Sequence, residues 1–458
     1  MNLPFMNRTS ELRKLNRIVS GTAPVLGVVY GRRRCGKSRL LQELPKAGTV
    51  YYLADQSDSS LQRQAMAREL SGVLPGFDDA SYPSWSALFD AVNKRSPRCK
   101  NRPITVIIDE FPYLASEDPS LPSVLQKTID THTWKTHLIL CGSSQRMMKG
   151  IVLDESAPLY GRAREIIKVR PLKAGWMGEA LGVDGKKAVE HFAVWGGVPR
   201  YWELCSEYST LRRALRELVF DRDGILHEEP RRLLRDNMRT DTQPHSLLAL
   251  IGSGVHRISE MAGRMGKPAM NLTKPLDLLI DMDLVSREVP FGEAGKNSKR
   301  TLYTINDPFC RFWYTYVQPN LSVLEQELYD RVTEQWRETF PHICGQAWES
   351  LARESIPHLR IGGYTWNKAS RWWARRGSGS HRELDIVAES TDGTALLLGE
   401  VKWGAFHPQT ERARLKQLSE QLPFAQGKRV VTACFGMNVK PQPARNVFGP
   451  DAVLKVLR

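Results

Sequence analysis

One eight-residue segment constrains the fold of this chain more than any other: Gly31-Arg32-Arg33-Arg34-Cys35-Gly36-Lys37-Ser38, which fits the pattern GxxxxGK[ST]. It follows a short apolar run, Val25–Tyr30, and precedes a helical pattern, Arg39–Leu44. A strand that passes through such a loop into a helix lets backbone N–H groups and the positive end of the helix surround phosphates. The segment therefore predicts a phosphate-binding loop, or P-loop. The competing interpretation is a glycine-rich turn that matches by chance.

The P-loop residues have expected roles in holding ATP and Mg²⁺, the two cofactors that the segment implies. Lys37 would reach the β- and γ-phosphates and act in catalysis, and the Ser38 hydroxyl would bind Mg²⁺. The expected nucleotide-contacting residues of this segment are Gly31, Arg32, Arg33, Arg34, Cys35, Gly36, Lys37, Ser38 and Arg39.

A second apolar run, Thr105–Ile108, ends in two carboxylates. Asp109 would hold Mg²⁺, and Glu110 would polarise the water that attacks the γ-phosphate. Similar short runs rich in β-branched residues occur at Val50–Ala54 and Leu138–Cys141. Such runs, separated by helical patterns, predict the buried strands of a parallel sheet covered by helices on both faces.

Two further residues near the expected site have alternative interpretations. Ser144 follows the strand pattern Leu138–Cys141 and would sit between the acids and the γ-phosphate, or it would cap a helix. Arg162 would stabilise the transition state on a neighbouring subunit of a homo-oligomer, or it would be a surface or sheet-edge arginine, which we favour.

The charge and cysteine content narrow the class of protein. The formal net charge is +15, which favours a polyanionic partner, most often nucleic acid, although a merely basic surface is the alternative. The seven cysteines are scattered and form no CxxC pair, so a disulfide framework or zinc site is not expected. No apolar run approaches the roughly 18 residues of a membrane span, and the start of the chain does not resemble a secretory signal. We therefore expect a cytoplasmic protein without a membrane partner.

The middle of the chain predicts a helical region followed by a winged helix. Residues from about 171 to 235 are mostly helical, and three helical patterns between about 243 and 283 precede two strand patterns, Leu284–Val289 and Thr301–Ile305. The third helix would enter a DNA major groove, and the loop between the strands would contact phosphates. The alternative is a module for protein or intrachain packing. The candidate DNA contacts are Lys267, Asn271, Thr273, Lys274, Lys296, Lys299 and Arg300.

A carboxylate–lysine pattern near the end of the chain is typical of metal-dependent nucleases. Asp385 lies on one predicted strand, and Glu400 and Lys402 share a face of the next, because side chains alternate along a strand. Asp385 and Glu400 would bind Mg²⁺ or Mn²⁺, and Lys402 would orient or deprotonate the attacking water. Glu349 would be a helical acid of the same site, and Gln417 a late addition to it. The alternative is a strand with a salt bridge.

A stretch just before this hairpin combines basic and aromatic residues, which suits nucleic-acid backbones and bases. The alternative is an exposed loop whose tryptophans pack on the core. The residues are Arg360, Lys368, Arg371, Arg375, Arg376, Arg382, Trp366, Trp372 and Trp373.

With these residues, the chain resembles the archaeal-type ATPases, a branch of the AAA/STAND-like P-loop proteins. Beside the P-loop and Asp109-Glu110, the matching segments are Phe5–Leu12, Cys141–Ser144, Pro158–Arg162, Gly196–Tyr201 and Asp307–Tyr314. The resemblance implies that Arg8 and Glu11 lie near the adenine and that Gly196–Pro199 belongs to a lid. It also implies that the C-terminal part is the family's domain of unknown function, which has been likened to the PD-(D/E)xK nuclease fold.

The expected fold class is α/β, with a P-loop NTPase parallel sheet and lid, a winged helix, and a restriction-endonuclease-like domain. The expected boundaries are 1–170 for the ATPase core, 171–240 for the lid, 241–325 for the winged helix and 326–458 for the nuclease-like domain. The leading hypothesis is an ATPase that acts on DNA through a metal-dependent nuclease controlled by nucleotide state. The alternative is an ATP-switched DNA- or protein-binding regulator with an inactive nuclease-like domain. A protein-remodelling ATPase is a third hypothesis, but it leaves the acid-and-lysine hairpin unexplained.

Overall fold

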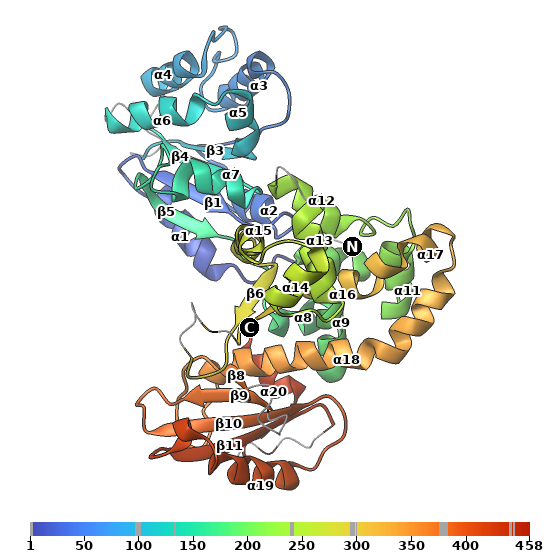
Figure 1. The fold of residues 1–458 in the computed structure, drawn as a ribbon. Coiled ribbons are helices and arrows are strands. Elements are labelled where there is room, and N and C mark those ends of the chain that lie inside the picture. The colour runs from blue at the N-terminus through green and yellow to red at the C-terminus, as the bar shows by residue number, and fades with distance from the viewer. Residues whose placement is uncertain are drawn as a thin grey trace. The chain divides into compact units, whose positions relative to one another are not determined.

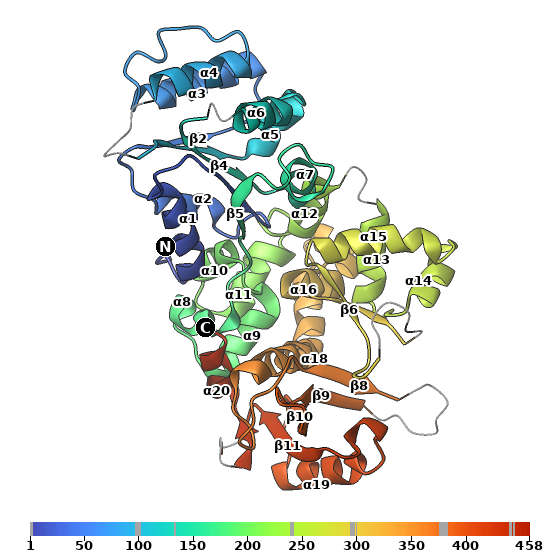
Figure 2. The ribbon, with the colours of Figure 1, turned by 90° about the vertical axis from the view of Figure 1, so that its left-hand side faces the viewer.

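The structure is a computed structural model, shown as a ribbon in Figures 1 and 2. It describes residues 3–96, 102–131, 134–238, 242–293, 298, 300–374, 383–438, 442 and 445–458. The chain divides into two compact units. The first in sequence is Phe5–Pro171 with Arg235–Arg239, and the other is Met1–Pro4 with Leu172–Leu234 and Thr240–Arg458.

The first unit is built on a parallel five-stranded sheet in the order β2-β3-β4-β1-β5. The predicted parallel sheet is confirmed, and β5, an edge strand of mixed polarity, completes it. All residues of β3 and β4 are buried, which explains their continuous apolar runs. The strands are β1 (Leu26–Tyr30), β2 (Thr49–Leu53), β3 (Thr105–Asp109), β4 (His137–Gly142) and β5 (Ala163–Lys168).

Helices cover this sheet. Apolar residues of α3 to α6 pack with strand residues into one large core, and α1 lies so close to β1 that a Cβ atom on Gly27 would be 2.4 Å from the Ile18 side chain. The helices are α1 (Thr9–Val19), α2 (Lys37–Gln42), α3 (Ser59–Ser71), α4 (Trp85–Arg95), α5 (Phe111–Glu117), α6 (Leu121–Asp130) and α7 (Gln145–Met148). Because β4 lies between β1 and β3, the carboxyl ends of these three strands meet along one edge, where the P-loop follows β1.

The second unit begins with short helices that form the predicted helical region. Its turn at Gly196–Pro199 needs a glycine at position 197, because a Cβ atom there would lie 1.9 Å from the carbonyl oxygen of Leu172. The elements are α8 (Met177–Leu181), α9 (Gly185–Trp195), α10 (Pro199–Cys205), α11 (Leu211–Leu215), a π-turn (Arg216–Phe220) and α12 (Glu229–Asn237).

Three helices and an antiparallel hairpin follow in the order that the sequence predicted for a winged helix. Pro275 lies inside the third helix, and the two strands pair from Val285–Ile305 to Glu288–Leu302. The elements are α13 (Thr242–Gly252), α14 (Ile258–Met265), α15 (Met270–Asp281), β6 (Val285–Glu288) and β7 (Leu302–Ile305).

The C-terminal part contains a five-stranded mixed sheet in the order β12-β11-β10-β9-β8. Strand β10 is antiparallel to β9 and parallel to β11, and α18 and α19 cover opposite faces (Figures 1 and 2). The strands are β8 (Ser370–Trp373), β9 (Glu383–Glu389), β10 (Ala395–Lys402), β11 (Arg429–Gly436) and β12 (Val447–Phe448). The helices are α16 (Pro308–Tyr316), α17 (Leu321–Glu325), α18 (Tyr329–Ser355), α19 (Pro408–Ser419) and α20 (Pro450–Val456).

Helix α16, from the segment Asp307–Tyr314, ties this unit together. Asp307 caps the helix through the Cys310 N–H at 2.7 Å. The Phe309 ring stacks on Trp195 of α9, and the Trp313 indole N–H donates to the His227 carbonyl. This segment therefore has a structural role, because it packs the C-terminal part against the helical region. The boundaries 1–170, 171–240, 241–325 and 326–458 stay a prediction.

Candidate nucleotide and metal sites

The P-loop has the backbone shape that phosphate binding requires. Gly36 has φ +85° and Arg34 φ +67°, and a Cβ atom on Gly31 would lie 2.3 Å from the Val169 carbonyl oxygen. Lys37 begins α2 and is buried, with its Nζ donating to the Arg32 carbonyl at 3.2 Å. The start of α2, the glycine-dependent curvature of the loop backbone and the buried lysine fit the phosphates of a nucleoside triphosphate.

Three arginines assigned to nucleotide binding have protein partners. Arg8 is buried and donates to the Cys35 carbonyl at 3.0 Å and to Glu11 at 3.2 Å, so it supports the P-loop backbone. Arg33 pairs with Asp236 at 2.8 Å. The guanidinium of Arg39 lies 5.9 Å from the centre of the Phe5 ring. We therefore expect nucleotide contacts in this loop to come mainly from its backbone, Lys37 and Ser38.

The two predicted acids occupy the end of β3. Asp109 is fully buried, and one of its oxygens accepts the backbone N–H of Glu110 at 2.9 Å. The Glu110 carboxylate accepts from the hydroxyl of Ser143 at 2.9 Å and from the Ser143 N–H at 3.2 Å. Ser144, for which the sequence allowed a place near the γ-phosphate or a helix cap, caps α7 by accepting from the Met147 N–H at 3.4 Å. The residue that touches the acid is thus Ser143, one position earlier.

Two side chains near Asp109 were missed by the sequence analysis. The Tyr51 hydroxyl, from the middle of β2, donates to Asp109 at 2.6 Å. The Cys141 thiol, from β4, is buried beside Asp109, and burial followed by the charge of Asp109 raises its pKa. A tyrosine and a cysteine in apolar strand patterns carry no sequence signal of a site. Only the strand order brings them to Asp109.

Arg162 has the structural role that we favoured from the sequence. Its guanidinium makes two hydrogen bonds of 2.7 Å to the carboxylate of Asp130. It precedes Ala163, which pairs with Leu26 at the start of β1, so Arg162 lies at the sheet edge opposite to the P-loop.

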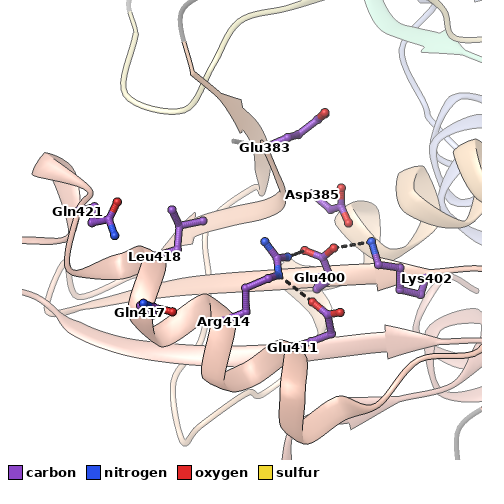
Figure 3. A pocket seen from close by; sticks show the side chains of 9 residues that line it. All are labelled: Glu383, Asp385, Glu400, Lys402, Glu411, Arg414, Gln417, Leu418 and Gln421. Carbon is purple, nitrogen blue, oxygen red and sulfur yellow. Dashed lines mark hydrogen bonds and ion pairs between the residues drawn. The ribbon is translucent and has the colours of Figure 1, made fainter. Parts of the chain in front are cut away.

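In the C-terminal part, the predicted residues meet in one groove of about 550 Å³ (Figure 3). Asp385 on β9 and Glu400 on β10 lie on adjacent strands, and Lys402 Nζ contacts Glu400 at 2.6 Å. Arg414, from α19, also pairs with Glu400 and with Glu411. The lining residues are Glu383, Asp385, Glu400, Lys402, Glu411, Arg414, Gln417, Leu418 and Gln421, so Gln417 does belong to the groove.

The groove is electrostatically strained in a way that a cation would relieve. Burial raises the pKa of Asp385 and of Glu400, and the charge of Asp385 raises that of Glu400 further. Burial lowers the pKa of Lys402, but the hydrogen bond and charge of Glu400 outweigh burial and raise it. Carboxylate oxygens are the ligands that Mg²⁺ and Mn²⁺ prefer, so the donors fit. Among the residues that the structure describes, however, no group of three or more His, Cys, Asp or Glu side chains is placed to hold a metal.

Glu349 lies near this pair, on α18. Burial, and then the charge of Asp385, raise its pKa to about 7. Arg353, one turn later, lies 3.7 Å from Glu349 and donates to the backbone carbonyl of Asp385 at 3.1 Å. The helical acid predicted from the sequence is thus electrostatically coupled to the groove, although it does not line it.

The basic and aromatic stretch before the hairpin is largely structural. Trp366 and Trp373 are buried, and Trp372 packs against Phe424, so the core-packing interpretation is correct for these tryptophans. Arg371 pairs with Glu383 and, at 3.3 Å, with Glu288. Three of the predicted cations, Arg375, Arg376 and Arg382, lie outside the described residues.

The hairpin after α15 also packs within the chain. The Phe291 N–H donates to the Arg371 carbonyl at 2.9 Å, and the Phe291 ring packs against Phe424. Arg300 pairs with Glu293 at 2.5 Å, and Lys296 and Lys299 lie outside the described residues. The predicted DNA-facing residues of the helical part are all exposed: Lys267, Asn271, Thr273 and Lys274.

Comparisons with known proteins agree with this geometry. Residues 5–178 match a family model described as an ATPase domain predominantly from Archaea, and residues 313–414 match one described as archaeal and bacterial proteins of unknown function. An uncharacterized protein of Methanocaldococcus jannaschii is 30% identical over 408 residues, which cover 87% of each chain. The chain belongs to this family of archaeal-type ATPases. Its first unit is the ATPase domain, as the resemblance implied.

A solved structure shares the fold of the ATPase part of this chain. A Walker-type ATPase of Pyrococcus abyssi is 18% identical with a TM-score of 0.50, over 68% of this chain and 96% of that one. The ORC2 protein of Aeropyrum pernix is 14% identical with a TM-score of 0.45, over 72% and 96%. The first of these supports the α/β fold class and says nothing about substrates. Within the described parts of the chain, no helix has both the length and the apolar character needed to cross a membrane.

Proposed function

We propose that this ATPase uses Mg²⁺ to hydrolyse ATP and acts on DNA through a metal-dependent nuclease site in its C-terminal part, under the control of nucleotide state. The observation that carries the proposal is the groove in which Asp385, Glu400 and Lys402 meet. Asp385 lies on β9, at least 15 positions before Glu400 and Lys402, and the adjacent strand β10 brings these two residues to it, as the predicted chemistry requires.

In the ATPase site, each residue has a distinct task. Bound Mg²⁺ would neutralise charge on the β- and γ-phosphates and would be held by Ser38 and Asp109. Lys37 leaves the Arg32 carbonyl to pair with phosphate oxygens. Glu110 accepts a proton from the attacking water, and Ser143 fixes the position of its carboxylate.

In the nuclease-like groove, Asp385 and Glu400 hold the metal, which would polarise the scissile phosphate. Lys402, whose raised pKa keeps its amine protonated, donates to the attacking water and orients it. The net charge of +15 and the exposed Lys267 and Lys274 on and beside α15 support a polyanionic partner. DNA is the polyanion that the helix–helix–helix–hairpin order favours.

One specific observation favours the alternative function, an ATP-switched regulator whose nuclease-like domain does not cleave. Glu400 is paired with two cations, Lys402 and Arg414, which compensate its charge without a metal. In that case the groove would be a structural cluster of salt bridges. The hairpin of β6 and β7, whose Phe291 N–H contacts the Arg371 carbonyl, would serve packing within the chain.

Cleavage of plasmid and single-stranded DNA, with Mg²⁺ or Mn²⁺ and with or without ATP, separates the two functions. We expect the wild-type protein to cleave DNA. Lys402→Ala should abolish cleavage, and Lys37→Ala should remove its dependence on ATP. Arg412→Ala is the control, because it removes a cation of α19 that contacts Thr432 instead of Glu400. Intact ATP hydrolysis without cleavage under any condition would establish the regulator in place of the nuclease for these substrates.

A further inference from the structure

The Tyr51 hydroxyl contacts Asp109, one of the two residues to which the ATPase site assigns Mg²⁺. Tyr51 lies in the middle of β2, the strand beside β3, and its oxygen is 2.6 Å from Asp109 Oδ2. Two side chains from adjacent strands therefore form one short hydrogen bond at the proposed metal site.

The direction of this hydrogen bond follows from elementary chemistry. An ionised carboxylate only accepts hydrogen bonds, so Tyr51 must donate its single proton to Asp109. That proton occupies one lone pair of Asp109 Oδ2, and the remaining lone pairs of the carboxylate are available to a cation.

The phenol keeps its proton under all ordinary conditions. Burial, followed by the hydrogen bond to Asp109 and the charge of that carboxylate, raises the pKa of Tyr51 above its ordinary value. The other Asp109 oxygen accepts the Glu110 N–H at 2.9 Å, so the carboxylate is held at both oxygens. The arrangement therefore fixes the orientation of the Asp109 carboxylate before any nucleotide binds.

We propose that Tyr51 is a positioning residue of the Mg²⁺ site, which orients Asp109 so that this carboxylate presents oxygen lone pairs to the cation. The inference rests on the proposed Mg²⁺ site and goes beyond it by assigning a residue that does not touch the metal. Partners that orient metal ligands in this way typically account for about 10- to 100-fold in metal affinity.

The chain supplies a matched control on the same strand. Tyr52 is the next residue of β2, and its hydroxyl donates to Gln62 at 3.1 Å, on the other side of the strand. Burial also raises the pKa of this phenol. Tyr52→Phe therefore removes a comparable buried hydroxyl from β2 without changing the hydrogen bond to Asp109.

The test measures how free Mg²⁺ concentration changes the affinity of the full chain for a fluorescent ATP analogue. For Tyr51→Phe we expect the Mg²⁺ concentration at half-maximal effect to rise about 10- to 100-fold, with unchanged affinity in EDTA. Tyr52→Phe should behave like the wild type, and circular dichroism should show that both variants are folded.

The outcomes distinguish this inference from the function on which it rests. An unchanged Mg²⁺ dependence in Tyr51→Phe would overturn the role of Tyr51, as would an equal effect of Tyr52→Phe, which would indicate a general disturbance of β2. If the wild type itself shows no Mg²⁺ dependence, the proposed Mg²⁺ site is wrong and this inference falls with it.

Discussion

Replacing Glu349 with glutamine should change how metal binding to the C-terminal groove depends on pH. The pKa of Glu349 is raised from 4.5 to about 7, first by burial and then by the charge of Asp385. A carboxyl group must lose its proton to support a cation. In the wild type, metal affinity should therefore rise as the pH increases through 7, where Glu349 becomes negative.

The structure sets the size of this effect. Moving a pKa from 4.5 to about 7 disfavours the charged form of Glu349 by roughly 3 kcal/mol if the group is fully buried. Because 30% of the side chain is exposed, solvent screening reduces this to about 2 kcal/mol. At pH 6 about nine in ten molecules would carry a neutral Glu349, so affinity should fall about tenfold between pH 8 and pH 6.

Mn²⁺ binding can be followed by electron paramagnetic resonance between pH 5.5 and 8.5, without nucleotide. An Asp109→Asn background removes the contribution of the ATPase site. Glu349→Gln should bind Mn²⁺ as the parent does at pH 6 but about tenfold more weakly at pH 8, because it cannot become negative.

The same helix offers a matched control for this measurement. Glu354 is another acid of α18 whose pKa is raised, first by desolvation, but its charged neighbours are Lys173, His358 and Lys368 instead of the groove residues. Glu354→Gln should keep the parental pH profile. If Glu349→Gln leaves the pH profile of Mn²⁺ binding unchanged, Glu349 is not coupled to the metal site. An equal flattening of the profile by Glu354→Gln would also refute the coupling.

Three further predictions concern positions outside the groove. Gly31→Ala should abolish binding of ATP in a fluorescence titration, because its Cβ atom would lie 2.3 Å from the Val169 carbonyl oxygen; retained affinity would contradict the loop geometry. Arg162→Ala should keep the steady-state ATPase rate within about twofold, since Arg162 is paired with Asp130, whereas a loss of about 10³ or more would identify it as an arginine finger. Arg371→Gln should increase amide hydrogen exchange in the hairpin of β6 and β7, whose link to β8 depends on this guanidinium; unchanged exchange would show that the apolar contacts suffice.

Local sequence patterns were enough to predict much of the ATPase unit. The P-loop was predictable because glycines and a lysine at fixed spacing determine the shape of a short backbone segment between a strand and a helix. Strands β1 to β4 were predictable because continuous apolar runs are typical of strands buried on both faces. The pair formed by Glu400 and Lys402 followed from the alternation of side chains along one strand.

The sequence did not predict where β4 ends and α7 begins, and this boundary decides which serine lies at the nucleotide site. Ser143 and Ser144 are adjacent, and which of them faces Glu110 depends on where β4 ends and α7 begins. The sequence signal for a capping serine fits both residues equally well. The boundary itself is set by packing around the end of β4, which lies between β1 and β3.

The sequence by itself determined that this chain has a P-loop, two acids at the end of a buried strand, and an acid-and-lysine hairpin, because each of these depends on residues close together along the chain. Only the tertiary structure decided that Tyr51 donates to Asp109, and that Arg414 pairs with Glu400. Those contacts depend on the order of strands in a sheet and on the packing of a helix against it. Both are settled by the burial of side chains from the whole unit, which no local pattern records.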